Sequence, residues 1–249
     1  MNIGNNYAFR NAERMEQVGG GVATRRGIGT KTLLMLFIVM VSAITMISNL
    51  WRLGTNALGI YIAVCIANAV IQLIICFVPN TTKVLAIPYS ILEGLSLGVV
   101  VGILELALGD GQGFELAGLA LVMTIAVFFA AALLYSTGVI KAGHMFRSIM
   151  LTILFGILLS SLVISILSIF MYSTIVSMFQ TYGILISTLL VIVAGCYVVI
   201  SLDNANRIVD GGAPKKFEWF AAYGIVINIV WLFLEVLRLL MYLKNDNNF

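Results

Sequence analysis

The sequence predicts an all-α integral membrane protein, and three observations support that fold class. Hydrophobic residues make up 61% of the 249 residues and charged residues only 10%, whereas soluble domains carry roughly 25% charged residues. So few charges cannot cover a folded chain in water, but they suffice when lipid surrounds it. The apolar residues also gather into seven long segments. We therefore expect one membrane domain with seven transmembrane helices.

Each of the seven apolar segments is long enough to cross a bilayer, because a hydrocarbon core about 30 Å thick requires roughly 20 helical residues. The predicted spans are Thr32–Leu50, Ala57–Val78, Val84–Leu108, Leu116–Ile140, Ile149–Tyr172, Tyr182–Leu202 and Phe217–Leu243. A flexible polar tail, residues 1–31, is expected before this membrane domain of residues 32–243. A short tail, residues 244–249, is expected after it.

Polar or helix-breaking stretches separate the spans. They are Trp51-Arg52, Pro79–Lys83, Gly109–Gly113, Lys141–Arg147, Ser173–Thr181 and Asp210–Lys216. The stretch Ser173–Thr181 is the weakest of these breaks, since it is polar but uncharged. Without it the fifth and sixth spans would form one helix too long for a bilayer, so we predict a connection there. Six spans are the alternative count.

The distribution of basic residues predicts the orientation. With the N-terminus in the cytoplasm, eleven of the fourteen Lys and Arg residues fall on the inner side, and three (Arg52, Arg238 and Lys244) fall on the outer side. Basic residues accumulate on the cytoplasmic side of membrane proteins. We therefore expect a multi-pass protein with its N-terminus inside the cell and its C-terminus outside.

Charged residues inside the spans are the first candidates for function, because each costs about 2.5–3.5 kcal/mol at the bilayer centre on insertion scales. Asp203 lies at the cytoplasmic end of the sixth predicted span, and Arg207 and Asp210 follow on the same face if the helix continues. Asp203 is then either a charge solvated at the membrane interface or a titratable group that faces a cavity. Both interpretations stay open at this stage.

The last span carries a second set of polar residues. Glu235 and Arg238 are three residues apart, so they either pair within the helix or each contacts another helix. Asn228 lies about two turns earlier. Buried amides often bond across helices, and this amide is also a candidate for lining an ion path.

In the third span, Glu93 heads a run that contains a strip of glycines. Gly94, Gly98 and Gly102 recur every four residues, a spacing that allows another helix to approach closely. We interpret the strip as structural and Glu93 as a candidate for the ion pathway. Asn68 and Gln72 form an i, i+4 polar pair in the second span, for which hydrogen bonding between helices is the default interpretation.

Other classes of function lack support in the sequence. The three cysteines, Cys65, Cys76 and Cys196, lie in apolar runs without C-x-x-C spacing, which predicts neither a disulfide nor a metal site. His144 is the only histidine, and no phosphate-binding loop precedes a helix. The net charge of +3 gives no indication of nucleic-acid binding. We expect no enzymatic activity and no cofactor.

Several stretches resemble the Bax inhibitor-1 family, and in particular its bacterial branch. They are Asn5–Arg10 in the tail, Pro88–Gly98, Leu134–Lys141 with Phe146-Arg147, Leu202-Asp203, Gly212–Trp219 and Trp231–Leu240. The resemblance covers nearly the whole chain and is most specific in its last forty residues. It implies seven helices, six of which surround a central seventh, in the cytoplasmic membrane of a cell.

The resemblance also implies functions and site residues. Members of the family are associated with a pH-sensitive calcium leak, and some modulate a membrane-anchored AAA protease. Asp203 matches one aspartate of a proton-sensing pair, whereas the second falls at Asn228, which is an amide here. Arg238 matches an arginine that forms a latch to a neighbouring helix. Because Asn228 cannot share a proton with Asp203, we expect the titration of Asp203 to depend on Arg207 and on burial.

The function expected from the sequence is therefore a pH-sensitive, calcium-permeable leak channel. Its candidate residues for pH sensing and the ion pathway are Asp203, Asn228, Arg207 and Glu93, with Glu235 and Arg238 as a pair or latch. The partners expected are the lipid bilayer and Ca²⁺ as the permeant ion. The alternative is an interaction protein that modulates a membrane protease through its tail, residues 1–31.

Overall fold

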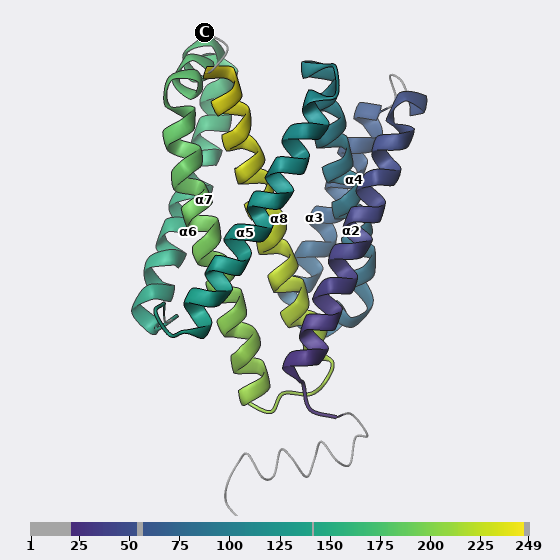
Figure 1. Ribbon diagram of the computed structural model, residues 1–249, viewed down its shortest axis with the longest axis vertical. Coiled ribbons are helices and arrows are strands. Elements are labelled where there is room, and N and C mark those ends of the chain that lie inside the picture. Colours follow the sequence, from purple (N-terminus) through teal and green to yellow (C-terminus); the bar gives the residue numbers. More distant parts are fainter. Residues whose placement is uncertain (1–20, 54–56, 141, 247–249) are drawn as a thin grey trace, which may run out of the picture. The chain divides into compact units, whose positions relative to one another are not determined.

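The computed structural model describes residues 21–53, 57–140 and 142–246, and long helices dominate these ranges. The elements are α2 (Arg25–Leu53), α3 (Ala57–Phe77), the short 3-10 turn η3 (Pro79–Thr81), α4 (Thr82–Leu108), α5 (Gln112–Ser136), α6 (His144–Phe170), α7 (Tyr172–Asp210) and α8 (Phe217–Asp246) (Figure 1). Seven helices in the described part of the chain are long and apolar enough to cross a membrane. The predicted all-α, seven-span fold class is confirmed.

The structure differs from the prediction at the connection between the fifth and sixth spans. The predicted break, Ser173–Thr181, is wrong, because these residues form the first turns of α7. α6 ends at Phe170, and Met171 leaves helical geometry with φ −130° and ψ 43°. Hydroxyls in the predicted break bond back to the preceding turn, as Thr181 Oγ1 does to the Ser177 carbonyl at 3.0 Å. Such bonds satisfy polar side chains inside a helix, so polarity without glycine or proline does not end it.

As a result, α7 is longer than a bilayer is thick. Its 39 residues span about 58 Å at a rise of 1.5 Å per residue, whereas the hydrocarbon core measures about 30 Å. The first ten residues are rich in Ser and Thr, and the last eight, Asp203–Asp210, carry charges. The helix therefore satisfies its own backbone through the apolar centre and places polar turns at both ends.

Other boundaries shift by a few residues, each for a local reason. α5 ends at Ser136, four residues before the predicted limit, because Gly138 adopts a left-handed conformation with φ +73°. Pro79 starts η3, and α4 follows directly at Thr82. α6 begins at His144, five residues before the predicted start.

The chain forms two compact parts, which are described separately. The first contains the described residues up to Phe114 together with Asn204–Ile227, and the second contains Glu115–Asp203 together with the described residues from Asn228 onward. In the first part, α4 packs against both α2 and α3 (Figure 1). In the second part, the hydroxyl of Tyr197 in α7 donates to the Met150 carbonyl in α6 at 2.8 Å.

The glycine strip of α4 explains how closely α2 approaches it. A Cβ added at Gly98 would lie 2.6 Å from the Ala43 carbonyl oxygen and 2.7 Å from the Met46 Cβ. Gly94 faces the Val39 carbonyl oxygen in the same way, whereas a Cβ at Gly102 would meet the Leu50 side chain. Because backbone atoms occupy the space that a side chain would need at Gly94 and Gly98, close packing of the two helices requires glycine at these two positions.

The segment before α2 is attached to the connection between α7 and α8. The Ala23 amide donates to the Ala213 carbonyl, and the Lys215 amide donates to the Gly21 carbonyl, each at 2.8 Å. Together with the antiparallel bridge between Val22 and Pro214, these bonds fix the described end of the predicted tail. Residues 1–20 of that tail, including the stretch Asn5–Arg10, lie outside the described residues, as do Lys141 and residues 247–249.

Burial varies strongly among the spans. In the most apolar 18-residue window of α8, 56% of the residues are buried, against none in that of α6. α6 therefore offers most of its surface to lipid, while α8 is the most enclosed helix.

Candidate functional site

Asp203 is held by side chains from two neighbouring helices. The Arg147 guanidinium of α6 forms an ion pair with Asp203 Oδ2, and the Tyr135 hydroxyl of α5 donates to Asp203 Oδ1 at 3.1 Å. The Asp203 side chain is 15% exposed and the Arg147 side chain 29%. A charged pair with this burial is partly desolvated, so its attraction is stronger than that of a surface pair.

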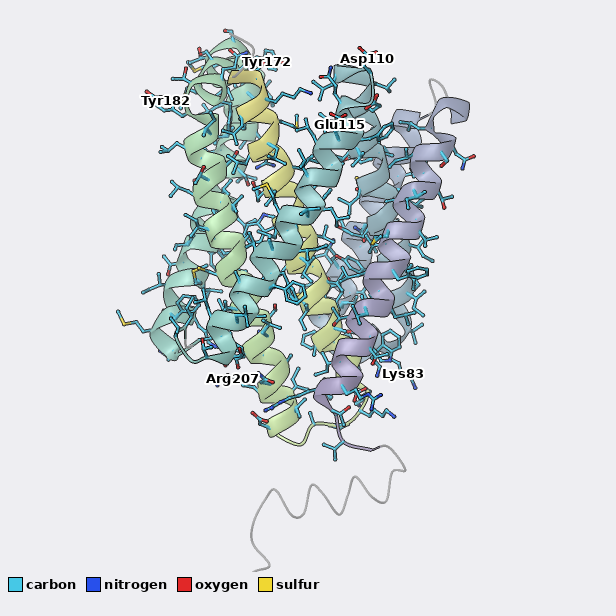
Figure 2. The ribbon with its side chains drawn as sticks, in the orientation of Figure 1. Lys83, Asp110, Glu115, Tyr172, Tyr182 and Arg207 are labelled. Atoms are coloured by element: carbon cyan, nitrogen blue, oxygen red, sulfur yellow. The ribbon has the colours of Figure 1, made fainter. Side chains whose placement is uncertain are left out.

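The short connection between α5 and α6 brings these two partners together. Tyr135 lies in the last turn of α5 and Arg147 in the first turn of α6. Arg147 Nε also donates to the Ala142 carbonyl at 3.0 Å, which orients the guanidinium toward α7. Arg207 follows Asp203 by four residues and lies in the last turn of α7 (Figure 2).

Asn228 bonds to the backbone of α7. Its side-chain amide donates to the Tyr197 carbonyl at 3.3 Å, and the rings of Tyr197 and Trp231 lie 5.6 Å apart. Tyr197 precedes Asp203 by six residues, or about 9 Å along the helix axis. The amide therefore serves as a hydrogen bond between helices, one of the two interpretations offered for it.

Glu235 and Arg238 pair within α8. Arg238 Nη1 lies 2.9 Å from Glu235 Oε2, and Trp231 Nε1 donates to Glu235 Oε1 at 3.1 Å. The Glu235 side chain is only 6% exposed, whereas that of Arg238 is 50% exposed. Of the two alternatives, the structure shows the pair within the helix.

Glu93 belongs to a polar cluster in the first part of the molecule. The Asn68 side-chain amide of α3 donates to Glu93 Oε2. One turn before Glu93, the Tyr89 ring packs edge-on against Tyr223 at 4.8 Å. Asn68 Oδ1 is buried and has no hydrogen-bond partner in the described part of the chain. The cluster can therefore accept further hydrogen bonds near a carboxylate.

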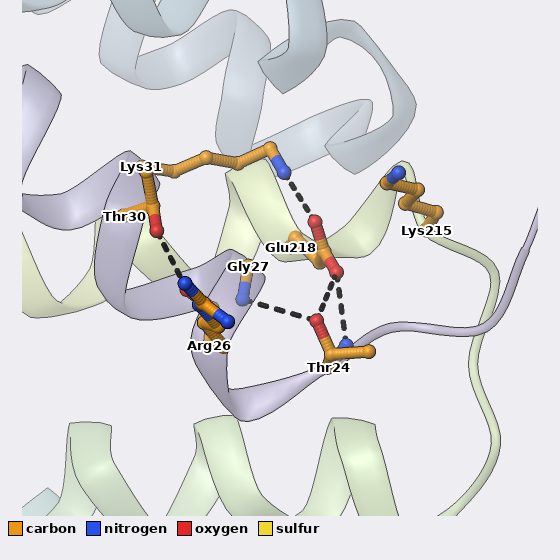
Figure 3. Close-up of a pocket in the computed structure, with 7 residues that line it drawn as sticks. All are labelled: Thr24, Arg26, Gly27, Thr30, Lys31, Lys215 and Glu218. Carbon is orange, nitrogen blue, oxygen red and sulfur yellow. Dashed lines mark hydrogen bonds and ion pairs between the residues drawn. The ribbon is translucent and has the colours of Figure 1, made fainter.

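Another carboxylate with several partners is Glu218, at the start of α8. Its side chain is fully buried and forms an ion pair with Lys31 of α2. It also accepts hydrogen bonds from the backbone amide and the hydroxyl of Thr24, at 2.9 and 3.1 Å (Figure 3). Any side chain at Gly27 would collide with this carboxylate. Glu218 thus ties the beginnings of α2 and α8 together.

Arg147, Tyr135 and Glu218 are not among the candidates that the sequence indicates. Arg147 and Tyr135 lie at the connection of two spans, where a basic or aromatic residue is ordinary at a membrane interface. Glu218 is the second residue of the last predicted span and lies close to Lys215 and Lys216, so it resembles an ordinary charge at the membrane interface. A sequence signal does exist for all three, since each falls within a stretch that resembles the family.

Metal-ligating side chains do not gather in the described residues, where no group of three His, Cys, Asp or Glu could hold an ion. Three acidic side chains in the spans, Glu93, Asp203 and Glu235, each face a nearby donor. Such pairs can respond to protonation or to a passing cation by exchanging partners.

Comparison with known proteins identifies one family. The family model described as Bax inhibitor 1 like matches residues 4–245. No curated protein and no solved structure matches the chain.

Proposed function

Because the chain belongs to the Bax inhibitor 1 like family, we propose that it forms a pH-sensitive, calcium-permeable leak pathway in the membrane. Membership of the family confirms the resemblance at that level, while assignment to the bacterial branch stays a prediction. The observation that carries the proposal is the ion pair of Asp203 with Arg147, which joins two helices at the end of a span.

Protonation of Asp203 would change how three helices are held together. In the charged state, Asp203 attracts Arg147 and accepts a hydrogen bond from Tyr135. A proton removes the negative charge and leaves the partly buried guanidinium without its counterion, which is unfavourable. The ends of α5, α6 and α7 would then separate or exchange partners, and this rearrangement is the proposed gate.

The carboxylates in the spans of the second part, Asp203 and Glu235, also suit a weakly selective path for Ca²⁺, which prefers oxygen ligands. Each faces a donor from the protein, Arg147 for Asp203 and Arg238 for Glu235. A passing cation must compete with these donors, so the proposed conduction is slow. The proposal keeps the predicted orientation, with the N-terminus in the cytoplasm.

Calcium flux into proteoliposomes that contain a calcium dye tests this function. Flux is measured from about pH 6 to pH 8 for the wild type and for Asp203→Asn, which retains the shape of the side chain but removes its charge. Asp210→Asn is the matched control, since Asp210 lies on the same face of α7 but pairs with Arg25 in an exposed position.

The expected result is protein-dependent flux whose pH response is lost in Asp203→Asn and retained in Asp210→Asn. Flux equal to that of empty liposomes at every pH, from folded protein, would contradict the leak pathway. An unchanged pH response in Asp203→Asn would contradict the sensor role alone.

A second candidate is the modulation of a membrane-anchored protease through the N-terminal tail. The observation in its favour is the attachment of residues 21–23 to the connection between α7 and α8, since it fixes the point from which the preceding residues leave the membrane domain. Deletion of residues 2–20 separates the two functions. Loss of protease binding with intact flux would support modulation, and loss of flux with intact binding would support transport.

A further inference from the structure

A pocket lies where α2 and α8 begin. It has a volume of about 360 Å³ and is open to the outside. Its walls come from the first turns of α2, the start of α8 and the connection before α8 (Figure 3). None of the residues proposed for ion conduction lines this pocket, so its function is separate from the ion path.

Three basic side chains and one acid line this pocket. The acid, Glu218, is buried and already bonded to Lys31 and to Thr24, so its negative charge is neutralised within the protein. Arg26 and Lys215 are exposed, and their charged groups have no hydrogen-bond or ion-pair partner among the residues that the structure describes. In Figure 3 they lie on opposite sides of the Glu218 carboxylate. The open part of the pocket is therefore positively charged.

The position of the pocket relates it to the membrane surface. α2 and α8 both enter their apolar runs within a few residues of Lys31 and Trp219, and the Lys31 ammonium lies 5.4 Å from the Trp219 ring. A tryptophan beside lysines is typical of the interface where lipid headgroups lie. The predicted orientation puts this pocket on the cytoplasmic side, where basic pockets between transmembrane helices bind anionic headgroups.

We propose that this pocket binds the phosphate group of an anionic phospholipid. Arg26 offers a planar guanidinium that can donate two hydrogen bonds to phosphate oxygens, and Lys215 adds a flexible point charge. The volume exceeds what a bare phosphate needs and leaves room for the rest of a headgroup. Because Arg26 belongs to α2 and Lys215 to the connection before α8, the bound lipid would join the same two segments as Glu218.

Calorimetric titration of the purified protein in detergent tests the site. The probes are short-chain phosphatidylglycerol, short-chain phosphatidylcholine and inorganic phosphate. The proteins are the wild type, Arg26→Gln with Lys215→Gln, and Lys83→Gln as a matched control. Lys83 is an exposed basic residue on the same predicted side of the membrane, but it does not line the pocket. The thermal midpoint of each variant establishes that it is folded.

The proposal expects the wild type and Lys83→Gln to bind phosphatidylglycerol more tightly than phosphatidylcholine. The double variant should lose roughly tenfold or more in affinity for phosphatidylglycerol, since each basic side chain near an anionic lipid contributes to binding. Equal affinity of the wild type and the double variant would overturn the site. Binding of inorganic phosphate as tight as that of the lipid would overturn the lipid as its ligand and indicate a soluble phosphate instead.

Discussion

Glu218 and Asp203 are both carboxylates near the ends of spans, yet the two parts of the molecule hold them differently. Glu218 is fully buried and bonded to a lysine, a hydroxyl and a backbone amide. Asp203 is partly exposed, and the partners described for it here, Arg147 and Tyr135, are side chains. A backbone amide cannot rotate away, whereas side chains can change rotamer. The comparison teaches that the Glu218 carboxylate is held more firmly than the Asp203 carboxylate, whose side-chain partners can exchange.

The largest effect is expected from breaking the fixed carboxylate. Glu218→Ala leaves Lys31, which is 16% exposed, without its counterion in a poorly hydrated place. Removal of one partner of a buried pair costs about 3–5 kcal/mol, so the thermal midpoint of the protein in detergent should fall steeply. Replacing both partners, with Glu218→Gln and Lys31→Met, should recover part of the loss. A midpoint unchanged in Glu218→Ala would show that the pair does not hold α2 to α8.

The next effect concerns packing in the same part of the molecule. Gly94→Ala places a Cβ against the Val39 carbonyl and the Ser42 side chain, and overpacking of this kind costs about 1–3 kcal/mol. Gly118→Ala in α5 is the matched control, because nothing lies within 4 Å of its Cβ position. There the better helix propensity of alanine should maintain or raise the thermal midpoint. Equal behaviour of the two variants would refute the close contact between α2 and α4.

An effect of about the same size is expected at the releasable carboxylate. Arg147→Gln removes the ion pair, and a hydrogen bond to a charged group contributes about 1.5–3 kcal/mol. A double-mutant cycle with Asp203→Asn should reveal coupling between the two residues in the thermal midpoint. The same cycle measured on the pH response of calcium flux should show that either substitution alone abolishes it. Strictly additive effects would mean that the two side chains act independently.

The smallest effect is expected at the exposed pair of Arg25 and Asp210. Their charged atoms are 3.0 Å apart, but their side chains are 68% and 64% exposed, and such pairs contribute little in water. Arg25→Gln should leave the thermal midpoint within experimental error, at low and at high salt. A clear loss that disappears at high salt would show that this pair, too, stabilises the attachment of α2.

The sequence predicts the spans well because apolar length is a local property. It also predicts the glycine strip of α4, since the spacing of Gly94, Gly98 and Gly102 alone implies close packing. The predicted position of the connection between α6 and α7 is wrong for a local reason as well. Serine and threonine hydroxyls can bond to the backbone of their own helix, so the polar stretch Ser173–Thr181 continues α7.

The partners of the candidate residues could not be predicted in the same way. Asp203 stands out because a charge in a span is costly, but the choice of Arg147 as its partner depends on how three helices pack. The partners of Glu218 are even harder to predict from the sequence. Its role depends on Lys31, 187 residues earlier, and on the backbone of Thr24, and no spacing in the sequence connects them.

That separation also sets an order of events during synthesis. Lys31 enters the membrane with the first span, whereas Glu218 belongs to the last. At roughly 5–20 residues per second, the ribosome needs on the order of 10–40 s to add the intervening 187 residues. Throughout that interval the first helix carries a cation without its counterion. The nascent protein can therefore complete the attachment of α2 only after its final helix has emerged, so a chain truncated before α8 lacks the contact that holds its beginning in place.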